Sequence, residues 1–463
     1  MRTLSEFRNE PLTDFTKPQN RTAMEAALEK VKREFGSEYP LIIGGKRITG
    51  LKTFDSLNPS HKGQILGKFQ KGSREHVEQA IDAAWKAFES WKRQPVDIRA
   101  GVLLKAAALM RQRKHEFSAT MIYEVGKTWP EADADTAEAI DFLEFYAREA
   151  YRYGGQQPIT KIESEENELV YIPLGAGAVI PPWNFPLAIM AGMTSAAIVT
   201  GNTVILKPSS DAPLIAYRFI ALLEEAGMPA GVANFVSGSG GEVGDPLVQH
   251  PRIRFISFTG SKEVGLHINE EAAKPRKGQI WIKRVVAEMG GKDAIIVDRE
   301  TKDLDRAASD VVASAFGFQR QKCSACSRLI VDSAIYDKFV PMVVEKTKAL
   351  RLGPSEKSDA QIGPVVNESA MRKIKEYIDK GAKEGRLVAG GKVHGEDGYY
   401  IEPTVIADVD PDATIAQEEI FGPVLAVMKA KDFDDALRIA NDSPFGLTGA
   451  VFTDNPEKIR RAE

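Results

Sequence analysis

The sequence predicts an α/β protein built from two parallel-sheet domains, because two long stretches alternate between short apolar strands and amphipathic helices. The first stretch covers residues 169–271, where a strand at 204–206 is followed by a helix at 214–226 and a further strand at 233–236. The second stretch starts near Arg284 and continues to residue 441. Parallel strands joined by crossover helices produce such alternation. We therefore expect two Rossmann-like sheets.

The region before residue 150 is predicted to be mainly helical. Apolar residues recur every three or four positions in four segments, at 21–35, 77–91, 100–113 and 132–152. A short apolar run that contains Gly44-Gly45 predicts a β-hairpin at 41–48. These elements are expected to complete the first domain.

Composition and charge narrow the classes of function. The chain has 463 residues and a formal net charge of −4, so its charge gives no reason to expect binding to nucleic acid or to an anionic membrane. Two cysteines cannot cross-link a chain of this length, which favours a reducing, cytoplasmic location. The first ten residues are too polar for a signal peptide.

One uncharged stretch, residues 171–203, is long enough to span a bilayer. It contains four prolines and several glycines, which divide it into a strand, an irregular loop and a helix at about 187–200. The stretch is therefore predicted to be buried in the protein, and no membrane association is expected.

Three features together indicate a bound nucleotide. A glycine-rich turn at 238–244, which includes Gly241, comes close to the dinucleotide fingerprint but misses its third position. A second turn, Gly260-Ser261, follows a strand and opens a helix, where backbone N–H groups can face a pyrophosphate. Lys207 stands at the C-terminal end of a parallel strand, where open α/β sheets bind ligands. Each feature alone is better explained as an ordinary turn or a solvated lysine, so the prediction rests on the combination.

Cys323 is the candidate nucleophile. It forms a C-x-x-C pair with Cys326, but the six histidines are scattered without metal-ligand spacing, so no metal site is predicted. Taken alone, the two cysteines would be interpreted as small residues buried in the core. A redox-active dithiol is the alternative interpretation. A free thiol titrates near ~8.5, so a following helix, Lys322 or a bound nicotinamide is expected to lower the pKa of Cys323.

Two further residues make a catalytic interpretation of Cys323 the better one. Glu288 follows a predicted strand and precedes Gly290-Gly291, so its carboxylate is expected on a loop where it can accept a proton from the thiol or from water. Asn184 lies on a rigid loop between prolines, where its amide can donate to an oxyanion. Taken alone, Glu288 would be a solvated carboxylate and Asn184 a turn residue. Together these residues predict covalent chemistry of a thiol on a carbonyl group.

From about residue 35 to its end, the chain resembles the aldehyde dehydrogenase superfamily. Six motifs in the expected order carry the resemblance: Pro182-Trp183-Asn184-Phe185-Pro186, Lys207-Pro208-Ser209, Phe258-Thr259-Gly260-Ser261, Glu288-Met289-Gly290-Gly291, Gln321-Lys322-Cys323 and Glu418-Glu419-Ile420-Phe421-Gly422-Pro423. The resemblance implies an NAD-binding domain at 1–150 and 170–287, a small oligomerisation hairpin at 151–169 and a catalytic domain at 288–463. The hairpin in turn implies a homodimer or a higher homo-oligomer.

The resemblance also implies a mechanism. Cys323 would attack a small-molecule aldehyde, while the Asn184 amide and the Cys323 backbone N–H hold the oxyanion, and hydride would pass to NAD. Glu288 would then activate the water that releases the acid from the thioester. NAD would lie against residues from several loops, namely Trp183, Lys207, Ser209, Ser210, Gly241, Thr259, Gly260, Ser261, Glu419 and Phe421.

Ser210 bears on the choice of cofactor. It stands where many members of the superfamily carry a glutamate against the adenosine ribose. A small neutral side chain does not repel a 2′-phosphate, so we expect use of NAD with some tolerance of NADP.

Within the superfamily, the chain is most similar to the bacterial 1-pyrroline-5-carboxylate dehydrogenases, through residues 9–15, 39–45 and 322–328. This similarity implies oxidation of L-glutamate γ-semialdehyde to L-glutamate, in proline and arginine breakdown. The substrate would contact a small set of residues: Glu138, Phe185, Ser324, Gly449 and Ala450.

Two features depart from the family pattern. Arg320 stands where the family has glycine before Gln-x-Cys, and it is expected to distort the nucleophile loop or, alternatively, to help acidify the thiol. The chain stops seven residues after Pro456 opens a predicted helix. The C-terminal segment that completes the catalytic domain in the family is therefore expected to be missing.

Other functions stay compatible with the sequence. Another aldehyde dehydrogenase, for example one acting on succinate semialdehyde, would share these motifs, whereas a CoA-acylating relative is disfavoured because Glu288 directs the thioester to water. A non-catalytic relative, inactivated by Arg320 or by truncation, would bind the nucleotide without turnover. A thiol–disulfide oxidoreductase would need both Cys323 and Cys326.

Overall fold

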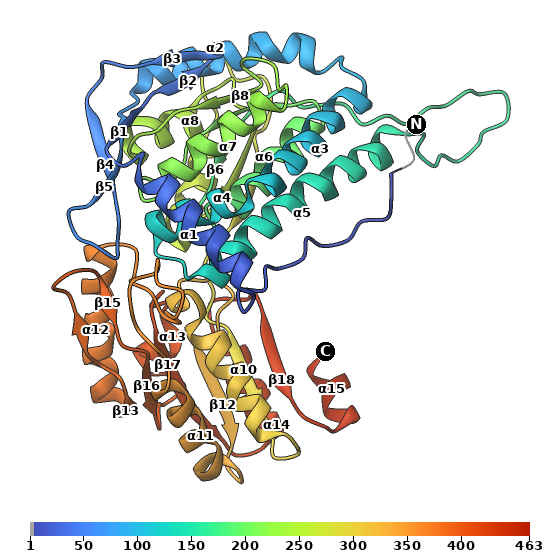
Figure 1. Cartoon of the computed structure of the whole chain (residues 1–463). Coiled ribbons are helices and arrows are strands. Elements are labelled where there is room, and N and C mark those ends of the chain that lie inside the picture. The colour runs from blue at the N-terminus through green and yellow to red at the C-terminus, as the bar shows by residue number, and fades with distance from the viewer. Residues whose placement is uncertain (1–3) are drawn as a thin grey trace. The chain divides into compact units, whose positions relative to one another are not determined.

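The computed structural model describes residues 4–463 and divides them between two folded units (Figure 1). Unit 1 comprises the residues up to Leu57, Ile65–Glu124 and Ala132–Glu288. Unit 2 comprises Asn58–Gln64, Val125–Glu131 and Met289–Glu463. The chain therefore leaves unit 1 for two short segments, 58–64 and 125–131, before it finally enters unit 2.

A seven-stranded sheet organises unit 1. Its strands lie in the order β10-β9-β6-β7-β8-β2-β3, and the five from β10 to β8 are parallel. The β2–β3 hairpin joins the sheet antiparallel to β8, as the sequence predicts for 41–48. The strands are β2 (Leu41–Ile43), β3 (Lys46–Ile48), β6 (Ala176–Ile180), β7 (Thr203–Leu206), β8 (Ala233–Phe235), β9 (Phe255–Thr259) and β10 (Arg284–Glu288).

Helices pack on this sheet through the apolar stripes seen in the sequence. In α2 (Arg74–Trp91), which packs against β2, β6, β7 and β8, Val77, Ile81 and Phe88 are buried. The other helices of unit 1 are α1 (Pro18–Lys32), α3 (Val96–Gln112), α4 (Lys114–Val125), α5 (Trp129–Gly154), α6 (Ala188–Val199), α7 (Pro213–Glu225), α8 (Asp245–Gln249) and α9 (Lys262–Ala273). A small sheet of β1 (Ser37–Tyr39), β5 (Ile65–Gln70) and β4 (Thr53–Leu57) completes the unit.

The expected oligomerisation hairpin at 151–169 is not formed as a pair of strands. α5 continues to Gly154, and residues 155–175 contain neither helix nor strand. Figure 1 shows this segment as a long loop that extends away from the helices between α5 and β6. Val170, Tyr171 and Ile172 are exposed on it. A strand needs a neighbour to satisfy its backbone hydrogen bonds, and the described part of the chain offers none to this loop.

A six-stranded sheet organises unit 2, in the order β13-β16-β17-β12-β11-β18, and all strands except β13 are parallel. Side chains alternate between two cores: Ile295 and Val297 pack with α10 and α11, whereas Ala294 and Ile296 pack with α12, α13 and α14. The strands are β11 (Ala294–Val297), β12 (Arg328–Asp332), β13 (Arg386–Ala389), β16 (Thr404–Ala407), β17 (Val424–Ala430) and β18 (Gly449–Phe452). The helices are α10 (Leu304–Phe316), α11 (Tyr336–Lys348), α12 (Glu368–Glu384), α13 (Thr414–Gln417), α14 (Phe433–Asn441) and α15 (Pro456–Ala462), and β14 (Val393–His394) pairs with β15 (Tyr400–Ile401).

The uncharged stretch at 171–203 folds as the sequence predicts. It forms β6, an irregular loop at 181–187 and α6, and nearly all of β6 and α6 is buried. Within residues 4–463, no helix is long and apolar enough to cross a membrane.

Two glycines give a matched test of the packing in unit 1. A Cβ at Gly177 in β6 would overlap the ring of Phe255 on β9, whereas a Cβ at Gly101 in α3 would meet nothing within 4 Å. We expect Gly177→Ala to lower the free energy of unfolding by about 1–3 kcal/mol. Gly101→Ala should raise it by up to about 1 kcal/mol, because alanine favours the helix. Urea unfolding measures both, and equal effects of the two variants would contradict the packing described for β6.

Candidate active site

Loops of unit 1 that carry predicted site residues leave the sheet at the carboxyl ends of its parallel strands. The chain passes from β6 outward to β7 and β8, then returns to the other side of β6 as β9. A reversal of this kind is the point at which open α/β sheets bind ligands. The residues that follow or end these strands are Trp183, Asn184 and Phe185 after β6, Lys207, Ser209 and Ser210 after β7, Gly241 after β8, Thr259, Gly260 and Ser261 at the end of β9, and Glu288 at the end of β10.

Lys207 is suited to hold polar groups of a ligand at this edge. The side chain is only 8% exposed, and its ammonium donates to the Pro208 carbonyl oxygen at 3.0 Å. Burial lowers the pKa of Lys207 to about 8. A lysine ammonium has three donors, so this one has capacity left for ribose hydroxyls.

The start of α9 is suited to hold a phosphate. Ser261 caps the helix by accepting a hydrogen bond from the Val264 N–H at 3.3 Å, and Gly260 N–H donates to the Glu288 carbonyl oxygen at 3.1 Å. The first turn of a helix carries unpaired N–H groups and partial positive charge. With Lys207 at the end of β7, two strands away across β6, this edge fits a dinucleotide.

The sequence predicts that Glu288 lies on the loop after a strand. In the structure it is instead the last residue of β10. Its backbone pairs with Thr259 of β9, which extends the strand by one residue. The residue is exposed, so the carboxylate at this strand end is accessible to water and substrate.

Asn184 lies on the loop between β6 and α6 and is 5% exposed. The end of this loop is fixed where the Ala188 N–H, in the first turn of α6, donates to the Asp135 carboxylate at 2.7 Å. α6 has no capping side chain at its own N-cap residue, Leu187. The buried Asp135 of α5 therefore provides the cap that holds the loop with Asn184.

The loop that carries Cys323 begins with a left-handed turn in unit 2. Phe318, Gln319 and Arg320 have φ angles of 47°, 53° and 54°. Each such residue other than glycine costs roughly 1–2 kcal/mol. Strain of this kind persists only where surrounding contacts hold it.

Buried contacts of unit 2 hold this turn. The Gln319 amide donates to the Gly126 carbonyl oxygen at 2.9 Å and to the Pro364 carbonyl oxygen at 2.6 Å. The Lys127 ammonium lies 4.1 Å from the centre of the Phe318 ring. Gln319, Lys127 and Asp135 were not identified from the sequence. Leu187 cannot cap the helix that it precedes, so a capping carboxylate from elsewhere in the chain, here Asp135, could have been expected.

Cys323 is half-buried. The sequence predicts that its surroundings lower the pKa of the thiol, but they do not. Burial raises the pKa of the Cys323 thiol above its usual value, and the Ser324 backbone N–H offsets only part of this effect. No helix follows the cysteine, because the chain turns directly into β12. Lys322 pairs with Glu131 at 2.9 Å. An additional group, such as a base or a bound cofactor, is therefore needed to form the thiolate.

Arg320 strains the nucleophile loop and lies near the other cysteine. It is 2% exposed, its Nε donates to the Cys326 carbonyl oxygen at 3.3 Å, and its Nη1 atom has no hydrogen-bond partner. Burial raises the pKa of Cys326 to about 12, and Arg320 opposes this shift. Arg320 also lies near Lys292. Burial lowers the pKa of Lys292, and the positive charges of Arg320 and Arg328 lower it further. The left-handed backbone includes Phe318 and Gln319 as well as Arg320, so distortion of the loop by Arg320 stays a prediction.

Gly290 and Gly291 allow the close approach that the sequence predicts. A Cβ at Gly291 would overlap the Cys323 carbonyl oxygen, and one at Gly290 would overlap the Glu419 carboxylate. Glu419 accepts a hydrogen bond from the Gly291 N–H at 3.1 Å. Phe421 follows with a φ of 59°. Cys323, Glu419 and Phe421 thus lie at the amino edge of the sheet in unit 2, just before β12 and β17.

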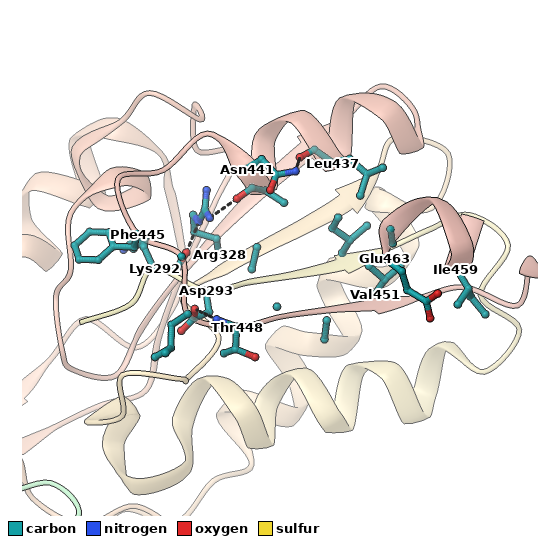
Figure 2. A pocket seen from close by; sticks show the side chains of 18 residues that line it. Lys292, Asp293, Arg328, Leu437, Asn441, Phe445, Thr448, Val451, Ile459 and Glu463 are labelled. Atoms are coloured by element: carbon teal, nitrogen blue, oxygen red, sulfur yellow. Dashed lines mark hydrogen bonds between the residues drawn. The ribbon is translucent and has the colours of Figure 1, made fainter. Parts of the chain in front are cut away.

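Three of the five predicted substrate residues lie in unit 2. Ser324 is exposed beside Cys323, and Gly449 and Ala450 pair with Ala294 and Ile295 at the start of β18. Gly449 and Ala450 also line a cavity of 560 Å³ together with residues shown in Figure 2, including Lys292, Asp293, Arg328 and Thr448. Figure 2 shows the Arg328 guanidinium donating hydrogen bonds to the carbonyl oxygens of Lys292, at 2.8 Å, and Ala440, at 2.7 Å. The other two, Glu138 on α5 and the half-buried Phe185, belong to unit 1.

The predicted residues thus form two groups, each assembled within one unit. Asn184, Glu288 and most cofactor residues gather at the carboxyl edge of one sheet, and Cys323 with Glu419 at the amino edge of the other. Among residues 4–463, no group of three or more His, Cys, Asp or Glu side chains is placed to hold a metal ion.

Comparisons with known proteins identify the family and the fold. Residues 47–463 match the aldehyde dehydrogenase family. A 1-pyrroline-5-carboxylate dehydrogenase from Geobacillus sp. (strain WCH70) is 56% identical over 456 residues, which are 98% of this chain and 88% of the relative. A solved 1-pyrroline-5-carboxylate dehydrogenase from Thermus with bound NAD is 51% identical with a TM-score of 0.98, and the match covers 100% of this chain and 89% of that one. Betaine aldehyde dehydrogenase from Staphylococcus aureus, in complex with NAD+, is 31% identical with a TM-score of 0.88, over 95% of this chain and 87% of that one.

Arg320→Gly should stabilise the protein. Glycine adopts positive φ freely, and the change removes a buried guanidinium nitrogen without a partner, an unmet group that costs about 1–3 kcal/mol. We expect a rise in Tm of several degrees, measured by calorimetry, together with higher turnover. Arg320→Ala is the matched control, because it removes the charge but keeps the strained backbone. A lower Tm for Arg320→Gly than for Arg320→Ala would show that backbone strain is not the larger cost.

The raised pKa of Cys323 predicts a pH profile for its reactivity. The thiolate is the nucleophile, so below the thiol pKa the rate of iodoacetamide alkylation should rise about tenfold per pH unit. Because burial raises the pKa of the Cys323 thiol above its ordinary value, the rate in the absence of cofactor should still be rising at the ordinary thiol pKa of about 8.5. Mass spectrometry identifies the labelled residue, and Cys323→Ser controls for reaction at buried Cys326. A plateau near pH 7 would mean that the apo protein already holds a thiolate.

Proposed function

The chain belongs to the aldehyde dehydrogenase family, and from this premise we propose that it oxidises L-glutamate γ-semialdehyde to L-glutamate with NAD. The observation that carries the choice of substrate is its similarity to 1-pyrroline-5-carboxylate dehydrogenases along 98% of its length. The positions of the predicted catalytic residues support the proposal, because Asn184 and Glu288 stand at the carboxyl edge of one sheet and Cys323 at the amino edge of the other.

The first step is the attack of the Cys323 sulfur on the aldehyde carbon. A C–S bond forms, and the carbonyl oxygen gains negative charge. The Asn184 amide and the Cys323 backbone N–H donate hydrogen bonds to this oxygen. Because the resting thiol is largely protonated, the Glu288 carboxylate takes the thiol proton as the bond forms.

Lys207 and the first turn of α9 hold the cofactor. When bound there, NAD supplies the acceptor for the hydride that leaves the aldehyde carbon. Glu419, which is held by the Gly291 N–H, is positioned to bind a ribose hydroxyl, and Phe421 lies on the same loop. Ser210 is small and exposed, which supports some tolerance of NADP.

The second step is hydrolysis of the thioester on Cys323. Glu288 first releases the thiol proton of the first step to solvent, and its carboxylate then accepts a proton from a water molecule as the resulting hydroxide attacks the thioester carbon. The C–S bond breaks, the acid product leaves and loses its proton to solvent, and the Cys323 thiolate takes the proton back from Glu288. Because Glu288 is exposed at the end of its strand, water can reach it.

The substrate carboxylate is held by Ser324 and by backbone N–H groups at Gly449-Ala450, while Glu138 takes the amino group and Phe185 contacts the carbon chain. The exposure of Ser324 beside Cys323 supports its part of this arrangement. The start of β18 lines the cavity of Figure 2, which supports access to Gly449 and Ala450.

The protein is further proposed to be a cytoplasmic homodimer or higher homo-oligomer. The exposed apolar residues Val170, Tyr171 and Ile172 support the assembly, because they lie on an extended segment whose backbone lacks strand partners in the described chain. The two free cysteines support a reducing compartment.

The activity is tested by following NADH formation with L-glutamate γ-semialdehyde and with succinate semialdehyde, and by repeating the assay with NADP. We expect the glutamate semialdehyde to give the higher kcat/KM, and NADP to be accepted less well than NAD. Cys323→Ala should abolish turnover, and Glu288→Gln should lower kcat by about 100-fold or more. Cys326→Ser is the control and should keep activity.

The outcomes separate the candidate functions. A higher kcat/KM for succinate semialdehyde would reassign the substrate. Loss of activity in Cys326→Ser would indicate a dithiol enzyme instead. NAD binding without turnover in every variant would identify a non-catalytic nucleotide-binding protein. If Arg320→Gly then restored activity, Arg320 would be the cause of the inactivity.

A further inference from the structure

Residues 124–135 pass from unit 1 into unit 2 and back within a short stretch of chain. Glu124 is the last residue of its part of unit 1, residues 125–131 belong to unit 2, and unit 1 resumes at Ala132. Both ends of this segment carry buried carboxylates, Glu124 and Asp135, each 1% exposed. A buried carboxylate costs stability unless it is hydrogen-bonded, so the partners of these two indicate what they do.

Glu124 caps α7, the helix that follows Lys207. Its two carboxylate oxygens accept hydrogen bonds from the N–H groups of Leu214 at 2.6 Å and Ile215 at 2.9 Å. α7 lacks a capping side chain at its own N-cap residue, Ala212. The position of this helix start, and of the loop from Lys207 that leads into it, therefore depends on Glu124.

Asp135 has the same relation to the loop of Asn184. It caps α6 through the Ala188 N–H at 2.7 Å, and α6 likewise has no cap of its own. Two helices that start directly after site loops are thus capped by carboxylates from the two ends of one segment.

The middle of the segment contacts the nucleophile loop within unit 2. The Gly126 carbonyl oxygen accepts from Gln319 at 2.9 Å, Lys127 stacks on Phe318, and Glu131 pairs with Lys322 at 2.9 Å. Gly126 has a φ of +70°, and a Cβ there would lie 2.9 Å from the Pro364 side chain. Only glycine fits this position without strain.

We propose that residues 124–135, here called the positioning segment, act as one element that fixes three loops of the active site. Glu124 positions the cofactor loop of Lys207, Asp135 positions the oxyanion loop of Asn184, and Glu131 holds Lys322, the residue that precedes Cys323 in the nucleophile loop. The roles of these loops rest on the proposed function. Since misplacement of a reacting group by about 1 Å can lower a rate 100-fold, each contact should have its own kinetic effect.

Three variants remove one contact each. Glu124→Gln turns an amide NH2 toward one of two backbone N–H donors, which displaces the start of α7. Asp135→Ala removes the acceptor for Ala188, whereas Asp135→Asn keeps it. Glu131→Gln removes the charge that pairs with Lys322. Asp141→Asn is the matched control, because this carboxylate of α5 accepts from Asn9 and Glu10 and touches no site loop.

Three readouts separate the contacts. Glu124→Gln should raise the Kd for NAD about tenfold, measured by calorimetry, because the loop of Lys207 shifts. Asp135→Ala should lower kcat about tenfold or more at saturating NAD, and Asp135→Asn should restore most of it. Glu131→Gln should move the pH profile of iodoacetamide alkylation to lower pH, because a Lys322 ammonium released from Glu131 is free to approach the thiol of the next residue.

The proposal is overturned if the three variants change all readouts by the same factor, as a general loss of folding would, or if any variant leaves its own readout within about twofold of wild type. Circular dichroism and Tm confirm that each variant is folded, and Asp141→Asn should leave the three readouts unchanged. NAD binding and thiol alkylation need no aldehyde, so a wrong substrate assignment would leave these two tests intact.

Discussion

The left-handed turn at Phe318-Gln319-Arg320 is the constraint on which the nucleophile depends. Three successive residues hold positive φ angles just before Cys323, in a conformation that their own backbones disfavour. The turn persists because buried groups contact it from several directions, above all the Gln319 amide with two backbone carbonyls. One of these carbonyls belongs to Gly126, so the geometry at Cys323 is tied to a segment almost two hundred residues earlier in the chain.

The predicted site residues stand at opposite edges of the two sheets, and the physical reasons differ. In unit 1 the ligand-facing groups follow the carboxyl ends of strands, where a reversal of strand order opens a crevice and helix starts offer N–H groups. In unit 2 the functional loops precede the strands β12 and β17, and close backbone approach through Gly290 and Gly291 brings Cys323 and Glu419 to one place. Glycine is needed at both positions because a side chain would overlap the groups that must meet there.

Arg320 is one of three buried cations, with Lys292 and Arg328, near the nucleophile loop. A fully buried guanidinium lies among Lys292 and Arg328, and the charge of Lys292 is strongly disfavoured there by burial and by its cationic neighbours. The carboxylates Asp293 and Glu419 oppose this accumulation of positive charge only in part. The same carboxylates help to keep the pKa of Cys323 high, so this charge cluster does not serve the thiol directly.

The sequence by itself predicted the two mainly parallel sheets and the loops that carry Asn184 and Lys207, because periodicity and strand-end motifs are local patterns. The tertiary structure decided what local patterns do not encode. It decided that burial raises the pKa of Cys323, that Lys322 pairs with Glu131, and that residues 155–175 form no hairpin within the described chain. The tertiary structure also decided that Glu124 and Asp135 cap two helices, because each capping residue lies 53 or more residues from the helix that it caps. Such contacts depend on which segments the fold brings together, and no spacing in the sequence records them.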